Sequence, residues 1–343
     1  MRIMSQRPLN AETPVEGLRT WITPNEIFFD RNQGAIPDTP IDLAEWSLTI
    51  SGAVQRGLQI TFDQIAKMPK TVVADTLECS GNGRSLLEKK ARGNPWTIGG
   101  VGNAEWGGVW LGDLLKQAEP TAQARHVAFE GFDRPLGKAG IKFIRSIPLA
   151  KAQSSTLLAY EMNGEPLPLK HGYPLRGLAL GWTGANCVKW LKTITLLENP
   201  YEGFFMDQVY RRFQKGETPG SGEVVTGLKV KSIITDPLKD ARLPLGPVPI
   251  CGAAYAGETG IDSVAVSLDN GKTWHAAVFT TPRTPYAWRH WRYDWRPREK
   301  GAHTILARAT DADGNRQPMS AHWNVLGYEN NGVREHGLPV TII

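Results

Sequence analysis

Runs of β-branched and aliphatic residues mark the strands that we expect in the first part of the chain. Residues 71–77 and 157–162 are two such runs, and two shorter ones lie within residues 43–58. The run at 157–162 ends at an Asn-Gly pair, 163–164, which is typical of a two-residue hairpin turn. Residues 1–40 show little periodicity, so we expect an irregular N-terminal arm there.

Two segments carry the signals of short helices. Thr61 and Gln64 fit a capping box, in which each side chain satisfies a backbone amide that the helix leaves free. Leucines recur at helical spacing within residues 111–115, and Pro120 would end that helix. Because these helices do not alternate regularly with the strands, the pattern favours an α+β domain over a doubly wound sheet.

The sequence changes character at residues 213–227, where glycine, proline, serine and glutamate dominate, and we place a domain boundary there. Beyond it helix signals nearly vanish, and alternating apolar residues on either side of the Asn-Gly pair at 270–271 predict a β-hairpin. Further runs that read as strands follow at 286–295, 303–310 and 333–343. Short strands at this spacing predict an immunoglobulin-like β-sandwich.

Length and composition fit a division into an arm at 1–40, an α+β domain at 41–215 and a β-sandwich at 225–343. The 343 residues allow two domains of ordinary size, and a hydrophobic fraction of 41% is typical of globular proteins. The net charge is +5, and the basic residues are spread along the chain, so nucleic-acid binding is a poor explanation for them. No apolar run approaches the roughly 20 residues that a membrane span needs.

Cysteine usage and the N-terminal residues both bear on the compartment. The three cysteines are too few for a disulfide scaffold and suit a reducing compartment. Residues 1–17 are polar and lack the apolar stretch of an export signal. We therefore expect a cytoplasmic protein as the sequence stands, or a periplasmic one if a signal has been removed.

The segment around Cys79 carries the strongest chemical signal in the sequence. Cys79 follows a predicted strand directly and precedes a Gly/Asn-rich turn, with Arg84 close enough to favour its thiolate. One interpretation is a buried structural cysteine, which is the common case for a single thiol. A second is a nucleophile that takes His171 as its base. A third is a single thiolate ligand to a soft metal.

Several segments of the chain, in order, resemble the sulfite oxidase family of molybdenum enzymes. The sequence TLECSGNGRS around Cys79 is similar to the cysteine loop of that family. Residues 157–177, followed by VKWL at 188–191, resemble its pterin-binding region, and residues 28–37 resemble the segment that carries a substrate arginine. Three further segments are similar to its C-terminal dimerisation domain: 230–237, 267–274 and 286–291.

The resemblance implies a molybdopterin cofactor with one molybdenum per chain and with Cys79 as its protein ligand, since a thiolate suits a soft metal. It implies cofactor contacts from a further set of residues: Phe29, Arg31, Asn32, Gln33, Asp133, His171, Arg176, Val188 and Lys189. It also implies a substrate pocket formed by Arg31, Arg84, Trp96, Tyr210 and Arg289. Arginines that converge on one point suit a doubly charged oxyanion such as sulfite.

The activity implied by the resemblance is the oxidation of sulfite to sulfate by oxo transfer, with the electrons passed to an external acceptor. The implied assembly is a homodimer without haem. Gln33 and Gly83 depart from residues that are common in the family, so another sulfur compound or another oxyanion is an alternative substrate. Outside the family, the alternatives are a non-catalytic binding module and a cysteine hydrolase that uses Cys79 and His171.

Overall fold

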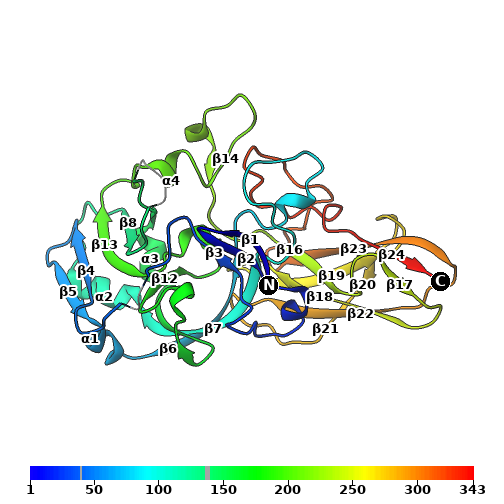
Figure 1. The fold of residues 1–343 in the computed structure, drawn as a ribbon, viewed down its shortest axis with the longest axis horizontal. Coiled ribbons are helices and arrows are strands. Elements are labelled where there is room, and N and C mark those ends of the chain that lie inside the picture. The colour runs from blue at the N-terminus through cyan, green and yellow to red at the C-terminus, as the bar shows by residue number, and fades with distance from the viewer. Residues whose placement is uncertain (39–40, 136–139) are drawn as a thin grey trace.

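The computed structural model describes residues 1–38, 41–135 and 140–343, and it shows an elongated molecule with a different domain at each end (Figure 1). The C-terminus lies at the far tip of the second domain, whereas the N-terminus lies near the middle of the molecule. No helix in the described ranges is long and apolar enough to cross a membrane.

The first domain is built from two sheets and four short helices. One sheet has the order β5-β4-β13-β8-β9 and consists of β4 (Ser47–Gly52), β5 (Leu58–Thr61), β8 (His126–Gly131), β9 (Ile144–Pro148) and β13 (Leu191–Leu197). The other has the order β11-β10-β7-β6, with β12 beside β10, and consists of β6 (Thr71–Glu78), β7 (Val101–Trp110), β10 (Thr156–Met162), β11 (Glu165–Pro166) and β12 (Arg176–Ala179). The helices are α1 (Phe62–Ala66), α2 (Leu111–Ala118), α3 (Leu149–Ser155) and α4 (Phe204–Asp207).

The local predictions for this domain are confirmed. The side chains of Thr61 and Gln64 form both halves of the capping box at the start of α1. Helix α2 ends at Ala118, and strands β10 and β11 pair across the predicted Asn-Gly turn. One aliphatic core joins the first sheet to α2 and β10, with Leu114 and Leu158 fully buried. The α+β class is confirmed as well, with strands far outnumbering helices along the described chain.

The N-terminal arm is not irregular, contrary to the expectation from the sequence. Strands β1 (Arg2–Gln6), β2 (Leu9–Glu12) and β3 (Asp30–Arg31) form a three-stranded sheet. The periodicity is missing because two polar side chains of β2 are buried rather than exposed, those of Asn10 and Glu12. Each is satisfied by a distant hydrogen bond, for example that from Thr97 Oγ1 to Glu12 at 3.0 Å, which no local pattern reveals.

The second domain is a sandwich of two sheets. Its first sheet has the order β16-β18-β22-β21 and consists of β16 (Lys231–Asp236), β18 (Val248–Tyr255), β21 (Val278–Phe279) and β22 (Arg289–Trp295). Its second has the order β17-β24-β23-β19-β20 and consists of β17 (Ala241–Leu243), β19 (Ile261–Ser267), β20 (His275–Ala276), β23 (Gly301–Asp311) and β24 (Leu338–Ile342). The predicted hairpin is present, since β19 pairs with β20, and the core between the sheets includes the buried residues Ile250, Trp291 and Ile305. A small hairpin of β14 (Arg211–Arg212) and β15 (Glu223–Val224) precedes this domain.

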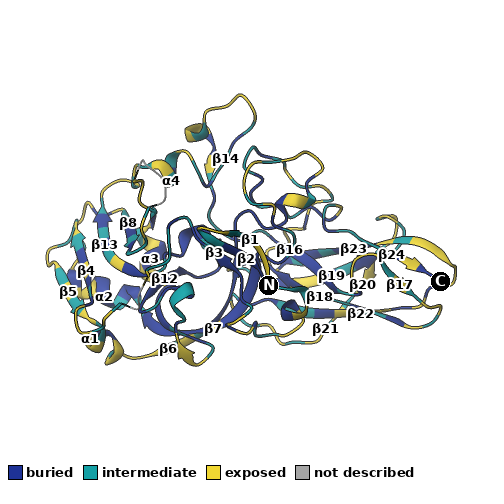
Figure 2. Ribbon diagram, viewed as in Figure 1, coloured by how far each residue is buried: buried dark blue, intermediate teal, exposed yellow. Residues whose placement is uncertain are grey.

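The segment between β23 and β24 leaves the sandwich and packs against the first domain. The Glu329 amide donates to the Ser80 carbonyl at 2.8 Å, and Asn330 Nδ2 donates to the Gly83 carbonyl at 2.7 Å. Figure 2 shows that buried strands continue from β7 to β18 across the junction of the domains. The second domain therefore reaches the turn that follows Cys79, and its residues can take part in a site there.

Candidate active site

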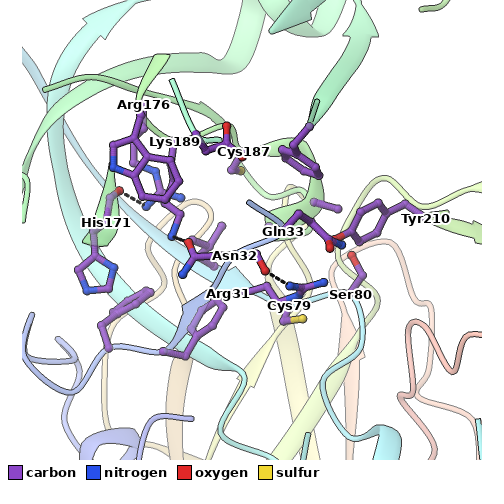
Figure 3. A pocket seen from close by; sticks show the side chains of 18 residues that line it. Arg31, Asn32, Gln33, Cys79, Ser80, His171, Arg176, Cys187, Lys189 and Tyr210 are labelled. Atoms are coloured by element: carbon purple, nitrogen blue, oxygen red, sulfur yellow. Dashed lines mark hydrogen bonds between the residues drawn. The ribbon is translucent and has the colours of Figure 1, made fainter. Parts of the chain in front are cut away.

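Two adjoining cavities meet at the end of strand β6, and Cys79 lines both of them. Figure 3 shows the side chains that line the inner one. The inner cavity is narrow, about 60 Å³, and contains a basic set: His171, Arg176 and Lys189. The outer cavity is wider, about 420 Å³, and contains Arg84. Three further residues line both cavities: Arg31, Gln33 and Tyr210. The two cavities thus form one crevice, with Cys79 at the junction.

A tight turn places Cys79 at this junction. The Asn82 amide donates to the Cys79 carbonyl at 2.8 Å, and the Cys79 amide donates to the Gly100 carbonyl at 2.8 Å. A Cβ at Gly81 would lie 2.2 Å from Arg84 Nη2, so glycine here lets the guanidinium approach the turn closely. The turn therefore holds the Arg84 guanidinium next to the backbone that carries the thiol.

The environment of the Cys79 thiol suits a metal ligand better than a free nucleophile. Burial raises its pKa, and the guanidinium groups of Arg31 and Arg84 offset this only in part. A bound metal ion would deprotonate the thiol and supply the missing positive charge. No cluster of three or more His, Cys, Asp or Glu is present in the described ranges, so a metal here would take its other ligands from a cofactor.

The inner cavity gathers buried cations. Burial lowers the pKa of Lys189 to about 7 and that of Arg176 to about 10. Burial also lowers the pKa of His171 well below its ordinary value, so this ring is neutral. Lys189 Nζ donates to Asn32 Oδ1 and to the Lys170 carbonyl, and Arg176 Nη1 donates to the His171 carbonyl at 2.8 Å.

These donors fit the phosphate of a molybdopterin cofactor. Arg176 Nε is buried and has no hydrogen-bond partner among the described residues. The buried carboxylate of Asp30 lies 3.6 Å from His171 Nδ1, but burial raises its pKa, so it offsets the cations only in part. A phosphate group would stabilise the charged forms of Lys189 and Arg176, and Arg offers it a bidentate fork. Asp133, whose pKa burial raises to about 6, lines the same cavity and could bond the pterin ring.

Three arginines line the outer cavity, and hydrogen bonds hold two of them, Arg31 and Arg84. Arg84 donates through Nε to the Leu326 carbonyl at 2.8 Å and through Nη1 to the Asn94 carbonyl at 2.7 Å. Arg31 Nη1 donates to Asn10 Oδ1 at 3.1 Å. These contacts fix both guanidinium groups in place and leave other N–H groups of each for an anion.

Tyr210 is held rigidly between the two cavities. Its backbone is left-handed, with a φ of 57°, and its ring stacks on that of Tyr328 at 5.4 Å. Gln33 Nε2 donates to the Tyr210 hydroxyl oxygen at 2.8 Å. Because that oxygen accepts from Gln33, the hydroxyl hydrogen is free to be donated to a ligand in the crevice. Gln33, one of the two departures from the family pattern, therefore orients Tyr210.

The other departure, Gly83, has a backbone explanation. Gly83 has a φ of 81°, a left-handed conformation that favours glycine. An added Cβ would lie 3.0 Å from His336 Nε2 and 3.1 Å from Asn330 Nδ2. The contact with the second domain therefore leaves little room for a side chain at this position.

Arg289 does not reach the site, and the prediction that it converges on Cys79 is corrected here. It begins strand β22, where it pairs with Ala254 of β18. Its guanidinium lies 3.4 Å from the centroid of the Phe279 ring, and Nη1 donates to the Ile261 carbonyl at 3.1 Å. The register of the sheet thus directs this side chain onto its own domain, and it lines neither cavity.

Two more predicted residues lie behind the crevice rather than in it. Trp96 is fully buried and packs edge-on against Phe29 at 6.2 Å, so it supports the lining without forming it. Val188 is buried in the aliphatic core of the first domain, next to Lys189 in the chain. Phe29 and Asn32 do line the inner cavity, as predicted.

Several lining residues were missed by reasoning from the sequence: Phe204, Phe205, Leu326 and Tyr328. Leu326 and Tyr328 belong to the segment between β23 and β24, which has no periodicity that would mark it as part of a site. Arg145 was missed as well. It is fully buried in β9, and its guanidinium lies 5.1 Å from the centroid of the Tyr210 ring. Nothing in the sequence around an arginine within a strand indicates such a contact.

Comparison with known proteins identifies both domains. A family model described as the oxidoreductase molybdopterin binding domain matches residues 33–205, and one described as the Mo-co oxidoreductase dimerisation domain matches residues 223–334. The sulfane dehydrogenase SoxCD from Paracoccus pantotrophus has a similar structure, with a TM-score of 0.85, 28% identity, and coverage of 99% of this chain and 88% of that one.

Relatives of known sequence agree with this assignment. The mitochondrial sulfite oxidase of Rattus norvegicus is 37% identical over 96% of this chain, which spans 64% of that relative's length. The sulfite oxidase of Arabidopsis thaliana is 34% identical over 96% of this chain and 91% of its own length. The nitrate reductase [NADH] 2 of Phaseolus vulgaris is 30% identical over 96% of this chain and 41% of its own length. With both domains matched and the cysteine junction in place, the chain belongs to the sulfite oxidase family of molybdopterin oxidoreductases.

Proposed function

We propose that this protein oxidises sulfite to sulfate, with water as the oxygen source and an external acceptor for the two electrons. One observation carries the proposal: Cys79 lies where a basic inner cavity meets an outer cavity that contains two fixed arginines. The first cavity suits the phosphate of the cofactor, and the second suits an oxyanion. This arrangement favours oxyanion chemistry at a metal held by Cys79 over hydrolysis by Cys79.

The chain's own residues bind and orient the two partners of the reaction. Cys79 would hold molybdenum, and Arg176 and Lys189 would hold the pterin phosphate. The molybdenum cofactor, when bound, supplies oxo transfer to sulfur and takes up two electrons. Arg31 and Arg84 would bind sulfite oxygens by charge-assisted hydrogen bonds and so fix the direction in which the sulfur lone pair points.

Tyr210 and burial complete the site. The Tyr210 hydroxyl would donate a hydrogen bond to an oxygen of the substrate, because its own oxygen already accepts from Gln33. Cys79 and Arg84 are buried, and the low local dielectric there strengthens each of these charged contacts. The hydrolase alternative would need His171 as a base, but burial lowers the pKa of this ring well below its ordinary value and so makes it a weak base. Its Nε2 lies 3.1 Å from the Asn25 carbonyl instead.

Metal analysis combined with an assay of sulfite-dependent ferricyanide reduction tests the proposal. We expect one molybdenum per chain, activity with sulfite and little with nitrate or thiosulfate. Cys79→Ser should lower turnover at least a hundredfold, because a harder oxygen donor replaces the thiolate. Three results would overturn the proposal. The first is full turnover in that variant, and the second is inactivation by iodoacetamide without any metal dependence. The third is a purified protein that contains no molybdenum or does not oxidise sulfite.

The assembly is also part of the proposal. The match of residues 223–334 to a dimerisation domain supports a homodimer formed through the sandwich. Light scattering at micromolar concentration should give twice the chain mass of 37.8 kDa. A monomer under those conditions would contradict this part without affecting the chemistry.

A further inference from the structure

The outer cavity in front of Cys79 has a cationic side and an apolar side. Three arginines form the first: Arg31, Arg84 and Arg92. The second is formed by Phe204, Phe205, Leu326 and Tyr328. Its volume of about 420 Å³ falls in the range of roughly 300–1,000 Å³ that is usual for pockets that bind organic ligands. An ion of four atoms needs only a small part of that space.

The protein itself already accepts hydrogen bonds from some of the N–H groups on the cationic side. Two of the Arg84 nitrogens donate to the backbone carbonyls of Leu326 and Asn94, at 2.8 and 2.7 Å. Arg31 donates to Asn10 Oδ1 at 3.1 Å. The remaining N–H groups and the Tyr210 hydroxyl can serve the anionic oxygens of a ligand, whereas the phenylalanine and leucine side chains on the apolar side offer no donor. Sulfite would therefore leave the apolar side chains without a contact, whereas an organic group on the sulfur would bury apolar surface against them.

The apolar side is preformed rather than incidental. The rings of Tyr210 and Tyr328 stack at 5.4 Å, and the Arg84 guanidinium lies over the Tyr328 ring, 5.4 Å from its centroid. The Phe204 and Phe205 rings meet edge to face at 5.1 Å. Phe204 is 44% exposed and lines the outer cavity, so its ring is available to a ligand.

We propose that, besides sulfite, this site oxidises organic sulfinates, in which an apolar group replaces one oxygen of sulfite. This inference rests on the proposed function, because it uses the same sulfur chemistry. The two sulfinate oxygens bind Arg31 and Arg84, and the organic group lies against Phe204 and Phe205. A sulfinate keeps the sulfur lone pair that reacts in sulfite.

The reaction balances in the same way as the oxidation of sulfite. A sulfinate, R–SO₂⁻, and one water give a sulfonate, R–SO₃⁻, with two protons and two electrons. The sulfur lone pair becomes the new S–O bond, and the oxygen comes from water. The two electrons leave through the molybdenum cofactor to a one-electron acceptor such as ferricyanide, two equivalents per turnover. No carbon–sulfur bond is broken.

Binding of unreactive sulfonates tests the apolar side without turnover. Titration calorimetry of the holoenzyme should show that benzenesulfonate binds about tenfold or more tightly than methanesulfonate, because the phenyl ring gains apolar contact. Kinetics should show ferricyanide reduction with benzenesulfinate as well as with sulfite. If sulfite is oxidised, but benzenesulfinate is not and the two sulfonates bind equally, this inference is wrong while the proposed function stands. If sulfite is not oxidised, the proposed function itself fails.

Replacing the exposed ring of Phe204 distinguishes sulfinate binding from a role of this ring in docking a protein electron acceptor. Phe204→Ser should lower the ratio of kcat/KM for benzenesulfinate to that for sulfite about tenfold. Val278→Ser is the matched control, since Val278 is 64% exposed but lies on β21 of the second domain, and it should leave the ratio unchanged. If Phe204→Ser keeps the ratio but slows reduction of a protein acceptor such as cytochrome c, the ring belongs to an acceptor surface and the proposal is overturned.

Discussion

The rings of Tyr210 and Tyr328 stack 5.4 Å apart with their planes at 16°, although one belongs to the first domain and the other to a segment of the second. A guanidinium lies near the outer face of each ring, Arg145 at 5.1 Å from the Tyr210 centroid and Arg84 at 5.4 Å from that of Tyr328. This stack joins Arg84, the proposed substrate arginine, to Tyr210, which lines both cavities. The sandwich domain is thus part of the wall of the active site.

Removal of the Tyr328 ring should affect both stability and substrate binding. Tyr328→Ala should lower the free energy of unfolding by about 3–5 kcal/mol, the usual cost of deleting a buried aromatic ring. The KM for sulfite should rise as well, because Arg84 and Tyr210 lose the ring that lies between them. Urea unfolding and steady-state kinetics measure the two effects. Tyr328→Phe keeps the stacked ring and serves as the control, and an equal loss in both variants would contradict the role of stacking.

Arg84 and Arg289 should behave differently, although sequence analysis assigned both to the substrate. Arg84→Met should raise the KM for sulfite about ten- to a hundredfold, since a charge-assisted hydrogen bond contributes roughly 1.5–3 kcal/mol. Arg289→Met should leave the KM unchanged, because that side chain packs on Phe279 in the second domain. Steady-state assays at equal molybdenum content make the comparison. A similar rise in both variants would show that Arg289 acts on the substrate after all.

Lys189 should make the stability of the cofactor-free protein depend on pH. Burial lowers its pKa from 10.5 to about 7 in the folded chain. Between these two values the unfolded chain binds more protons, so the free energy of unfolding should rise as the pH increases from 7 towards 10.5. Urea unfolding at several pH values measures this slope. Lys189→Met should remove this dependence of stability on pH. Bound cofactor should reduce it, because a phosphate keeps the lysine charged. An identical slope in the variant would show that Lys189 is not its source.

The buried ion pair between Glu78 and Lys231 should hold the two domains together. Lys231 Nζ lies 2.6 Å from Glu78 Oε1, which also accepts from the Tyr255 hydroxyl at 2.8 Å. Lys231→Met leaves the carboxylate buried with no cation and should lower the free energy of unfolding by about 3–5 kcal/mol.

Two controls qualify this prediction. Glu78→Gln in the same chain should restore part of the loss, because it removes the unpaired charge. Lys116→Met breaks the exposed pair with Asp113 and should change the stability by less than about 1 kcal/mol. If Lys231→Met lowered the free energy of unfolding no more than Lys116→Met does, the pair between the domains would contribute little to stability.

The sequence by itself determined the features that depend on neighbouring residues or on short motifs. The capping box at Thr61, the Asn-Gly hairpins and the alternation in the sandwich are local, because a few adjacent side chains satisfy a few adjacent backbone groups. The family resemblance placed Cys79, His171, Arg176 and Lys189 correctly around one crevice, since these residues lie within segments whose pattern is specific.

Only the tertiary structure decided which distant residues meet at that crevice. The strand register of β18 and β22 sends Arg289 onto Phe279, although its sequence context resembles a substrate segment. Leu326 and Tyr328 enter the site because a segment without periodicity folds back over the Cys79 turn. Hydrogen bonds hold it there: Arg84 Nε donates to the Leu326 carbonyl, and the Glu329 amide donates to the Ser80 carbonyl. Such contacts depend on the packing of whole domains, and spacing along the chain carries no trace of them.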